Sequence, residues 1–591
     1  MTSRRTLVWP VPSTQLAVAG VLAIVLGGGL VATFPRVADA AHPPSAMGQS
    51  YAASTDQADA TRAALDLMWY GGNAVDGAIA AALALGVVNP AASGLGGGGF
   101  ALVYTAKDKN VSVLDFRETA PASFSSAVLW PQKPSKPGEA APSPRATFTG
   151  VNGGVVGVPG EPAGLELLSQ RFGKKSLAED AAPAVGLARN GFYVGAHLAD
   201  QVDKHRARIA AAPSLGSVFL PGSVPVTYAT RVRRPELAAT IARFGAEGKR
   251  SIYEGATAEK IAGAVKAAGG TMTTKDLAEY QVKERAPLSR TYDGRTVYTM
   301  PAPSAGGLML LEVLGMYGAS PSSELARMGH GSSAYIHVVA EAMRGAFADR
   351  ARIAADPDVE RGVYAAYQAA LEPAQLAARK ARIQLDKTHA PAEFQTKEKG
   401  TSHLVVADGE GNIVALTTTI NGPFGASIVP DGTGIVLNNE LEDFTQRDEA
   451  QAFGLKDGGP NRPRPRARPA SSMAPTIVVE NGEPILALGG SGGTRIATGV
   501  VQAALGRLVF DLDPNACVSS PRFHTQGADL LVERDVPADV RDGLKNRGES
   551  VKEDPFGISA IQMIAWKRQP GKPARMLAAS DPRKAGLSAA R

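Results

Sequence analysis

Two threonines, Thr401 and Thr419, occupy positions in which one hydroxyl group could act as a nucleophile and the other could support it. Residues 401–408 and 412–419 are rich in β-branched side chains and flank a Gly-Glu-Gly sequence, which predicts a hairpin. If its loop holds three residues, Thr401 lies directly opposite Thr419. Directly paired Cβ atoms are ~5 Å apart, so we expect the two hydroxyl groups to reach each other.

The residue before Thr401 is a glycine in a polar stretch, and this arrangement favours cleavage of the backbone. The Thr401 hydroxyl can attack the Gly400 carbonyl to form an ester, which water then opens. Cleavage frees the α-amino group of Thr401, whose ordinary pKa of about 7.7–8 lets it take the hydroxyl proton near neutral pH. From the hairpin alone, a plain structural role for Thr401 is the simpler interpretation.

A glycine pair, Gly492 and Gly493, lies between a predicted strand and a predicted helix over residues 494–509. The first N–H groups of a helix lack partners within it, so this junction could stabilise an oxyanion. A phosphate loop is the alternative, but the segment lacks the GK[ST] sequence. A serine nucleophile at Ser491 is a further alternative that we do not favour.

A third group of residues could recognise a zwitterion. Arg117 ends a predicted strand, and arginine binds carboxylates with two parallel hydrogen bonds. Ser471 and Ser472 could donate to the same carboxylate, while the acidic segment 438–443 offers acceptors for an ammonium group. Together they would fit an α-amino acid, although each residue alone is more often a solvated loop residue.

The composition excludes several other classes of protein. The chain has 591 residues and a net charge of only +6, and its one dense basic run, residues 462–469, alternates arginine with proline. We therefore predict an extended, solvated loop there and no nucleic-acid partner. A single cysteine, Cys517, excludes an internal disulfide and is predicted to be buried. The scattered histidines lack metal-site spacing, so we expect neither a metal nor a cofactor.

The N-terminal segment is typical of an export signal. Arg4 and Arg5 precede an apolar stretch over residues 16–34, and Ala38-Asp39-Ala40 follows as a cleavage site. We therefore expect a signal peptide over residues 1–40 and a periplasmic or extracellular location. An uncleaved membrane anchor is the alternative, and the arginine pair could also mark twin-arginine export.

The remaining pattern predicts an α+β fold, a layered sandwich of antiparallel sheets covered by helices. Helices are expected within residues 57–90, 162–171, 235–244, 333–350 and 494–509. Strands are expected at residues 100–105, 111–116, 401–408, 412–419, 474–480 and 485–488. The glycine-rich segment 93–99 matches GxGxxG, but it follows a helix and precedes a strand. That order excludes a dinucleotide fingerprint and favours a close backbone crossing.

Taken in order, these motifs resemble the γ-glutamyltransferase family over residues 45–590. The resemblance in the upstream part rests on Asp115-Phe116-Arg117-Glu118 and on residues 300–307, Met-Pro-Ala-Pro-Ser-Ala-Gly-Gly. Downstream it rests on Thr401-Ser402-His403, Asp408, Gly411-Asn412, Thr419, Asn421, Leu437-Asn438-Asn439, Asp443-Phe444, Arg468 to Met473, Gly492-Gly493 and Ala579 to Arg583.

The resemblance implies a four-layer αββα N-terminal-nucleophile hydrolase that cleaves itself between Gly400 and Thr401. The large subunit would span residues 41–400 and the small catalytic subunit residues 401–591, and the two would form a heterodimer. The implied donors are glutathione and other γ-glutamyl compounds, and the implied acceptor is water, an amino acid or a peptide.

The family pattern also implies a role for each candidate residue. Thr401 would be the nucleophile supported by Thr419, and Gly492 and Gly493 would form the oxyanion hole. The α-carboxylate would bind Arg117, Ser471 and Ser472, and the α-amino group would bind Asn421, Glu440 and Asp443. Residues 446–460 resemble the lid of some members, and Phe453 stands at the position of a gating tyrosine.

Two other functions remain compatible with the sequence. A cephalosporin acylase or a poly-γ-glutamate-cleaving enzyme of the same superfamily is the nearer alternative. Asp443 argues against the acylase, because a glutaryl side chain carries no α-amino group. An exported binding protein without catalysis is the alternative from a different class, and it would need no backbone cleavage.

Overall fold

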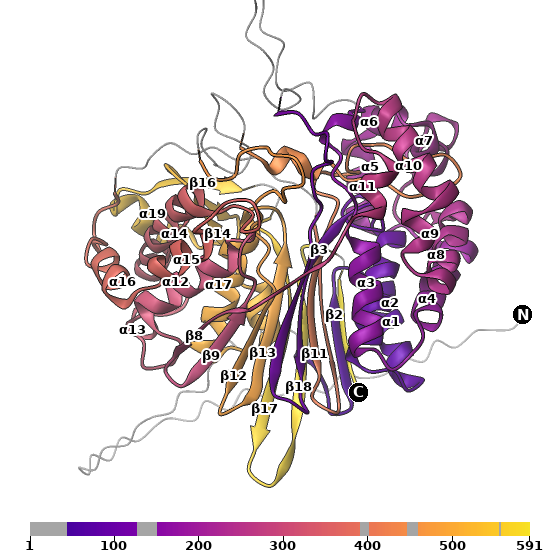
Figure 1. The fold of residues 1–591 in the computed structure, drawn as a ribbon. Helices are drawn as coiled ribbons and strands as arrows, with labels where there is room; N and C mark the ends of the chain where they lie inside the picture. The colour runs from indigo at the N-terminus through magenta and orange to yellow at the C-terminus, as the bar shows by residue number, and fades with distance from the viewer. Residues whose placement is uncertain (1–43, 127–150, 390–400, 446–458, 555–556, 585) are drawn as a thin grey trace, which may run out of the picture. The chain divides into compact units, whose positions relative to one another are not determined.

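Two antiparallel sheets of seven strands form the centre of the structure, a computed structural model (Figure 1). It describes residues 44–126, 151–389, 401–445, 459–554, 557–584 and 586–591. All of these belong to one compact unit, His42–Arg591. The predicted signal segment therefore lies outside the described residues, as do Gly400 and most of the predicted lid with Phe453.

The first sheet places strands from the C-terminal third of the chain between strands from the earlier part. In spatial order it contains β1 (Ala46–Gly48), β18 (Lys572–Ser580), β17 (Ala560–Gln569), β13 (Glu483–Ser491), β12 (Thr476–Glu480), β9 (Arg295–Thr299) and β8 (Leu288–Tyr292). The predicted hairpin around residues 481–482 is confirmed, with Glu480 paired to Glu483.

The second sheet contains the predicted nucleophile hairpin between strands from the earlier part of the chain. In spatial order it contains β19 (Leu587–Ala590), β2 (Tyr51–Thr55), β10 (Ser402–Asp408), β11 (Ile413–Thr419), β3 (Gly98–Thr105), β4 (Asn110–Phe116) and β7 (Lys283–Arg285). The segments before and after residue 401 therefore alternate within both sheets.

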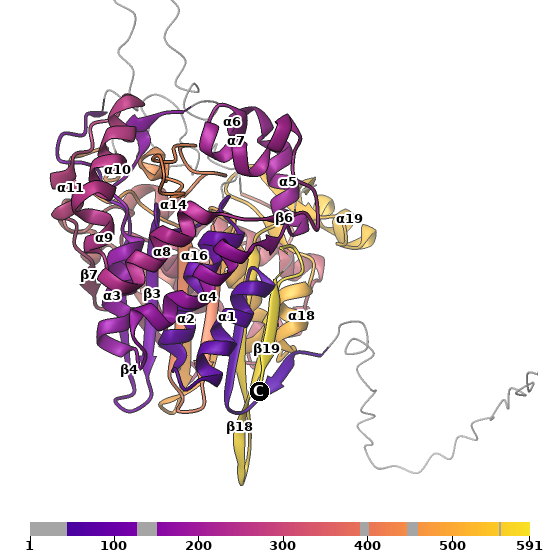
Figure 2. The same ribbon diagram turned by 90° about the vertical axis from the view of Figure 1, so that its right-hand side faces the viewer.

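Helices cover the outer face of each sheet and complete the predicted four-layer αββα sandwich (Figures 1 and 2). The second sheet is covered by α1 (Ala58–Trp69), α2 (Ala74–Val88) and α3 (Glu161–Phe172), with α4 (Leu177–Asn190) and α8 (Pro235–Glu247) outside them. The first sheet is covered by α12 (Gly306–Tyr317), α17 (Arg495–Leu508) and α18 (Pro514–Ser519), with α14 (Ser333–Ile353) against α12.

The remaining elements are short or peripheral. The helices are α5 (Ala196–Lys204), α6 (Arg206–Ala210), α7 (Pro213–Phe219), α9 (Arg250–Tyr253), α10 (Gly255–Ala267), α11 (Thr274–Ala278), α13 (Glu324–Met328), α15 (Val363–Ala370), α16 (Pro373–Lys380) and α19 (Ala538–Asn546). The strands are β5 (Phe192–Tyr193), β6 (Arg231–Val232), β14 (Phe523–His524), β15 (Asp529–Glu533) and β16 (Ser550–Asp554). None of the helices in the described ranges is long and apolar enough to cross a membrane.

Helix α2 shows why this sequence forms a central layer. Asn73 caps it by accepting from the backbone N–H groups of Val75 and Asp76, and the Asp76 carboxylate accepts from the Asn73 N–H group. Every residue from Ala74 to Val88 is buried. A helix that is apolar on all sides is stable only when it is enclosed by other elements, and α2 packs between the sheet and α4.

The segment between residues 160 and 385 contains more than the predicted helices and loops. Strands β8 and β9 form a hairpin, with Tyr292 paired to Arg295 across Asp293-Gly294. Both turn residues have positive φ, at 51° and 78°. An Asp-Gly pair is a recognised hairpin signal, so the sequence contained the information that predicts this turn.

Candidate active site

The hairpin of β10 and β11 brings the two candidate hydroxyl groups together. Ser402 pairs with Thr418, which confirms the predicted register and places Thr401 opposite Thr419. The two side-chain oxygens lie 3.4 Å apart, and both residues are buried. The Thr419 hydroxyl oxygen also accepts from the Asn421 N–H group at 2.8 Å, which fixes its position.

Close backbone packing supports the hairpin from its neighbour β3. The predicted crossing of the glycine-rich segment is confirmed, because a Cβ atom on Gly97 would lie 2.0 Å from the Thr419 carbonyl oxygen. On β11, next to Thr419, the Thr418 hydroxyl donates to the buried Glu161 carboxylate. Burial raises the pKa of Glu161 to about 7, although the Thr418 hydroxyl opposes the shift. Below this pH, Glu161 is a neutral group in the core.

The two threonines line a pocket together with most of the other predicted site residues. Its lining includes the predicted residues Arg117, Thr401, Thr419, Asn421, Glu440, Asp443, Ser471, Ser472 and Gly493. Arg350, Ala470, Met473 and Ile496 complete the lining. Segments that are far apart in sequence therefore converge on one cavity that contains a hydroxyl pair, two guanidinium groups and two carboxylates.

Arg117 is paired with two of the acidic residues that were predicted to accept from the ammonium group of a substrate. Its guanidinium group forms ion pairs with Glu440 and with Asp443, the latter at 2.8 Å, and also donates to the carbonyl oxygens of Pro469 and Ala470. Burial alone would lower the pKa of Arg117, but Glu440 and Asp443 raise it above its ordinary value. Positive and negative groups thus form one contiguous charged wall.

Asn421 extends that wall toward the nucleophile. Its side-chain amide donates to the Asp443 carboxylate at 3.0 Å and to the Asn439 carbonyl oxygen at 3.1 Å. Asn421 has a φ of 69°, a left-handed conformation that asparagine tolerates better than most residues. The residue therefore turns the chain sharply after β11 and presents its amide to Asp443.

The arginine–proline run positions the loop that carries Ser471 and Ser472. Arg464 contacts Glu360, Arg466 contacts Glu279, and Arg468 donates to the Gln281 carbonyl oxygen at 2.8 Å. The Arg468 side chain is only 4% exposed. The prediction of a solvated loop was therefore wrong for Arg468, whose charge is enclosed by acidic residues from distant segments.

The glycine pair lies at the predicted strand-to-helix junction. Gly492 and Gly493, with φ of 127° and 62°, connect β13 to α17, which begins at Arg495. Gly493 lines the pocket together with Thr401, and Gly492 precedes it beside Ser559. Of the predicted glycine pair, the structure therefore places Gly493 in the pocket lining with Thr401, and Gly492 outside it.

Ser491 does not have the geometry of a nucleophile. Residues 489–493 do have the G-x-S-x-G spacing, but the Ser491 side chain is fully buried and donates to the Asp56 carboxylate at 2.9 Å. It is not part of the pocket lining. The serine-nucleophile alternative therefore has no support in the structure.

Arg350 is a pocket residue that the sequence analysis missed. It lies on α14, is 1% exposed, and adds a second guanidinium group to the cavity. Burial lowers the pKa of Arg350 to about 10, although Asp443 opposes the shift. No local motif marks this position, because the residues around it follow an ordinary helical pattern.

One group of side chains within the described ranges has the spacing of metal ligands. His337, Glu341 and Glu549 are buried and lie close together. Arg344 forms ion pairs with both carboxylates, and His337 hydrogen-bonds to Glu549 at 2.6 Å. Arg344 and the rings of His337 and His389 already occupy both carboxylates, so the group is an ion-pair network between α14 and the segment before β16.

Comparison with known proteins agrees with this geometry. The gamma-glutamyltranspeptidase family model matches residues 60–591. The glutathione hydrolase proenzyme of Escherichia coli K12 is 33% identical over 92% of each chain. Glutathione hydrolase 2 of Arabidopsis thaliana is 34% identical over 91% of this chain and 93% of the relative.

A solved structure extends the match to the whole fold. The cephalosporin acylase of Bacillus halodurans superposes with a TM-score of 0.79 at 27% identity, covering 96% of this chain and 99% of the acylase. The acylase shares the architecture, whereas the family model and the two glutathione hydrolases point to γ-glutamyl chemistry. On the strength of the family match over nearly its whole length, the chain belongs to the γ-glutamyltranspeptidase family.

Proposed function

We propose that this protein is a γ-glutamyl hydrolase and transferase that acts through Thr401 after cleaving itself between Gly400 and Thr401. Its donors would be glutathione and other γ-glutamyl compounds, and its acceptors water, amino acids or peptides. The observation that carries the proposal is the hydroxyl pair of Thr401 and Thr419 in a pocket lined by buried, oppositely charged groups. A zwitterionic substrate matches that pocket.

The reaction follows from the positions of these groups. The Thr401 oxygen attacks the γ-carbonyl carbon, and the free α-amine of Thr401 takes the hydroxyl proton. The negative charge on the former carbonyl oxygen is stabilised by N–H groups of Gly492 and Gly493. The protonated amine then gives its proton to the leaving nitrogen, which departs as the amine product. Water or an acceptor amine opens the remaining ester and restores Thr401.

The charged wall would select the donor by its α-carbon substituents. Arg117, Ser471 and Ser472 would hold the α-carboxylate, and Asn421, Glu440 and Asp443 would hold the α-ammonium group. Because Arg117 already pairs with both acids, the substrate joins an existing ion-pair network. Each substrate charge therefore meets a group of opposite sign without leaving another buried charge alone.

The decisive test is processing of the purified protein. The proposal predicts two fragments on a denaturing gel, with Thr401 at the start of the smaller one, and a Thr401→Ala variant that stays whole and inactive. Thr271→Ala, at an exposed threonine, is the matched control and should be processed normally. Whole wild-type protein that hydrolyses γ-glutamyl-p-nitroanilide would show that the mechanism is wrong.

An acylase acting on glutaryl side chains is the second candidate, because of the fold match to a cephalosporin acylase. Two substrates that differ only in the α-amino group separate the candidates. The contacts around Asp443 predict a far larger kcat/KM for γ-glutamyl-p-nitroanilide than for glutaryl-p-nitroanilide. The reverse preference would support the acylase.

Export of the protein belongs to the same proposal. It rests on the basic, apolar and A-x-A sequence of residues 1–40, which lies outside the described residues. Fractionation of cells that express the full chain should recover activity outside the cytoplasm, and the large subunit should begin at Ala41. A large subunit that keeps residues 1–40 in the membrane fraction would favour the anchor instead.

A further inference from the structure

A lysine near the C-terminus contacts the backbone of the nucleophile. The Lys584 ammonium group donates to the Thr401 carbonyl oxygen at 2.5 Å and to the Ser491 hydroxyl oxygen at 2.8 Å. It also pairs with the Asp56 carboxylate at 3.2 Å. Its side chain is 12% exposed, so all three N–H bonds of the ammonium group are used within the protein.

Asp56 is equally well fixed. Its carboxylate is fully buried, accepts from Ser491 at 2.9 Å, and accepts from the Gln562 amide at 2.7 Å. Burying two opposite charges stabilises a fold only when geometry and hydrogen bonds are nearly complete, as they are here. The pair therefore holds the ammonium group of Lys584 at a defined point against Thr401.

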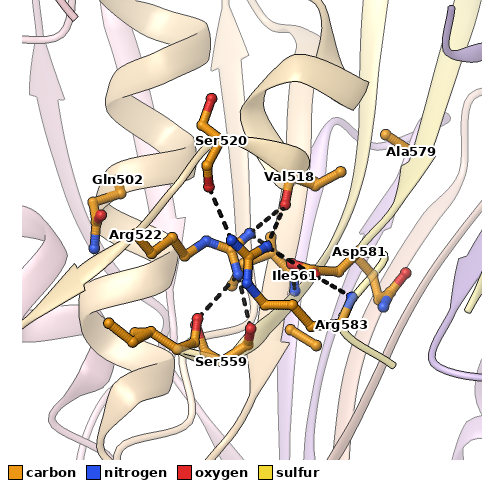
Figure 3. Close-up of polar contacts among 12 residues, drawn as sticks. Gln502, Val518, Ser520, Arg522, Ser559, Ile561, Ala579, Asp581 and Arg583 are labelled. Atoms are coloured by element: carbon orange, nitrogen blue, oxygen red, sulfur yellow. Dashed lines mark hydrogen bonds and ion pairs between the residues drawn. The ribbon is translucent and has the colours of Figure 1, made fainter. Parts of the chain in front are cut away.

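Polar contacts of Asp581 and Arg583 hold the turn that leads to Lys584 (Figure 3). Asp581 pairs with Arg522 at 2.6 Å and accepts from the Ile561 N–H group at 2.9 Å. Arg583 donates to the carbonyl oxygens of Val518 and Ser520 at 2.9 and 3.0 Å. The residue just before Lys584 is thus anchored to α18 and its C-terminal end, which leaves the lysine little freedom to leave Thr401.

We propose that Lys584 is a positioning residue for the nucleophile, which fixes the Thr401 carbonyl and keeps a positive charge beside the α-amine that cleavage releases. This inference rests on the proposed function, because it requires Thr401 to become an N-terminus. The α-nitrogen and the carbonyl belong to the same residue, so a group bonded to one lies within a few ångströms of the other.

The charge has a chemical consequence for the amine. A like charge at short range disfavours protonation, so Lys584 lowers the pKa of the α-amine and enlarges its neutral fraction. Only the neutral amine can accept the hydroxyl proton. Asp56 opposes Lys584 from the same side, and His197 of α5 is neutral there because burial, helped by Lys584, lowers its pKa to about 3. The pocket side presents two positive and two negative groups, Arg117, Arg350, Glu440 and Asp443.

Two substitutions with opposite expected effects test the proposal. Lys584→Met removes the positive charge and leaves Asp56 unbalanced, which should raise the pKa of the α-amine. The acid limb of the pH profile of kcat/KM should therefore move up by at least half a pH unit. Asp56→Asn removes the opposing carboxylate, so the limb should move down. The limb reports the free enzyme and is measured with γ-glutamyl-p-nitroanilide on the two-fragment protein. Lys584→Arg keeps the charge and is the matched control, with a limb close to wild type.

The kinetic constants provide a second readout. Lys584→Met should lower kcat at least threefold at pH 7 and leave KM unchanged, because the lysine does not line the substrate pocket. A structural role alone would lower activity in both variants without moving the limbs in opposite directions. Unmoved limbs, or limbs that move together, would overturn the proposal.

Two further outcomes are informative. If Lys584→Met stays uncut, the Asp56→Asn limb decides the question alone, and an upward shift or none would overturn the proposal. Failure of the proposed function looks different, because wild-type protein would then stay whole or Thr401→Ala would keep its activity. If the wild type is processed and active but the acid limbs of both variants stay at the wild-type pH, only the role of Lys584 is rejected.

Discussion

At the scale of single residues, the pocket contains buried charges that are paired before any substrate enters. Arg117, Glu440 and Asp443 are each almost inaccessible to solvent, and their ion pairs hold the guanidinium group against the wall of the cavity. Removing one partner of such a network leaves another charge unbalanced, which costs more than the loss of a surface ion pair. Substrate recognition should therefore be sensitive to single carboxylates.

Asp443→Asn tests this sensitivity. The variant keeps the shape of the side chain but removes a charge that Arg117 and Asn421 both contact. We expect KM for γ-glutamyl-p-nitroanilide to rise by about 30-fold or more, corresponding to about 2–5 kcal/mol for a buried charged partner, while self-cleavage proceeds. Asp431→Asn, at an exposed aspartate, is the control. Unchanged KM in the first variant would exclude Asp443 from substrate binding.

The sequence predicted the local residues of the site better than the distant ones. Thr401 and Thr419 could be paired because strand residues alternate with a strict period, so one assumed loop length determines every partner. Arg350 and Lys584 could not be found in this way. They reach the site from a helix and from a turn that are remote from the hairpin in sequence. Arg350 carries no local motif, and the motif from Ala579 to Arg583 that precedes Lys584 does not show that it lies beside Thr401.

At the scale of elements, the hairpin depends on how closely β3 approaches it. Every residue of β11 pairs with a residue of β3. Gly97 lies just before β3, and a Cβ atom on Gly97 would meet the Thr419 carbonyl oxygen. A larger residue there would push β11 away and move the Thr419 hydroxyl from Thr401. The spacing of the Thr401–Thr419 pair is thus determined by a backbone contact behind it.

Gly97→Ala should therefore damage both stability and processing. The added Cβ atom would meet the Thr419 carbonyl oxygen at 2.0 Å, and overpacking of this kind costs about 1–3 kcal/mol. Gly186→Ala in α4 is the matched control, because its Cβ atom would meet nothing within 4 Å. The control should gain about 0.5–1 kcal/mol from helix propensity. Thermal unfolding and the rate of fragment appearance measure both effects, and equal behaviour of the two variants would contradict this account.

The elements were predictable to different degrees for physical reasons. Hairpins with glycine turns and the helix over residues 494–509 follow from local patterns, and the structure places α17 at Arg495–Leu508. The order of strands in the two sheets does not follow from such patterns. It is decided by pairings such as β2 with β10, between residues hundreds of positions apart, for which one sequence contains no register signal.

At the scale of the whole molecule, the segments before and after Thr401 both contribute strands to each of the two sheets. Strands β2 and β3 flank the nucleophile hairpin, and β12, β13, β17 and β18 lie between β1 and the β8–β9 hairpin. The arginine–proline run adds side-chain contacts across the same division. Its predicted role as a solvated loop failed at Arg468 because Asp115 and Asp358, from two distant segments, lie beside that guanidinium group.

Arg468→Met tests the importance of these contacts for the assembled enzyme. Its guanidinium group lies 3.5 Å from the buried Asp115 carboxylate and 3.5 Å from the exposed Asp358 carboxylate. Its loss leaves Asp115 with Arg285 as its remaining arginine partner. In the uncut Thr401→Ala background, where one chain unfolds and refolds, we expect the substitution to lower the unfolding free energy in urea by about 1–3 kcal/mol. Arg466→Met, at a side chain that is 60% exposed, should change it by less than ~1 kcal/mol. Similar losses in both variants would contradict the assignment.

The interleaved strands also determine what happens if the mature enzyme unfolds. Before the backbone is cut, β10 and β11 can find their places between β2 and β3 within one tethered chain, at a high effective concentration. If the chain is cut before Thr401 as proposed, the same ladders must form between two separate polypeptides, and recovery becomes a second-order encounter that dilution slows. Such a cut would make assembly a one-time event, and the lifetime of the cut protein would depend on how slowly it opens.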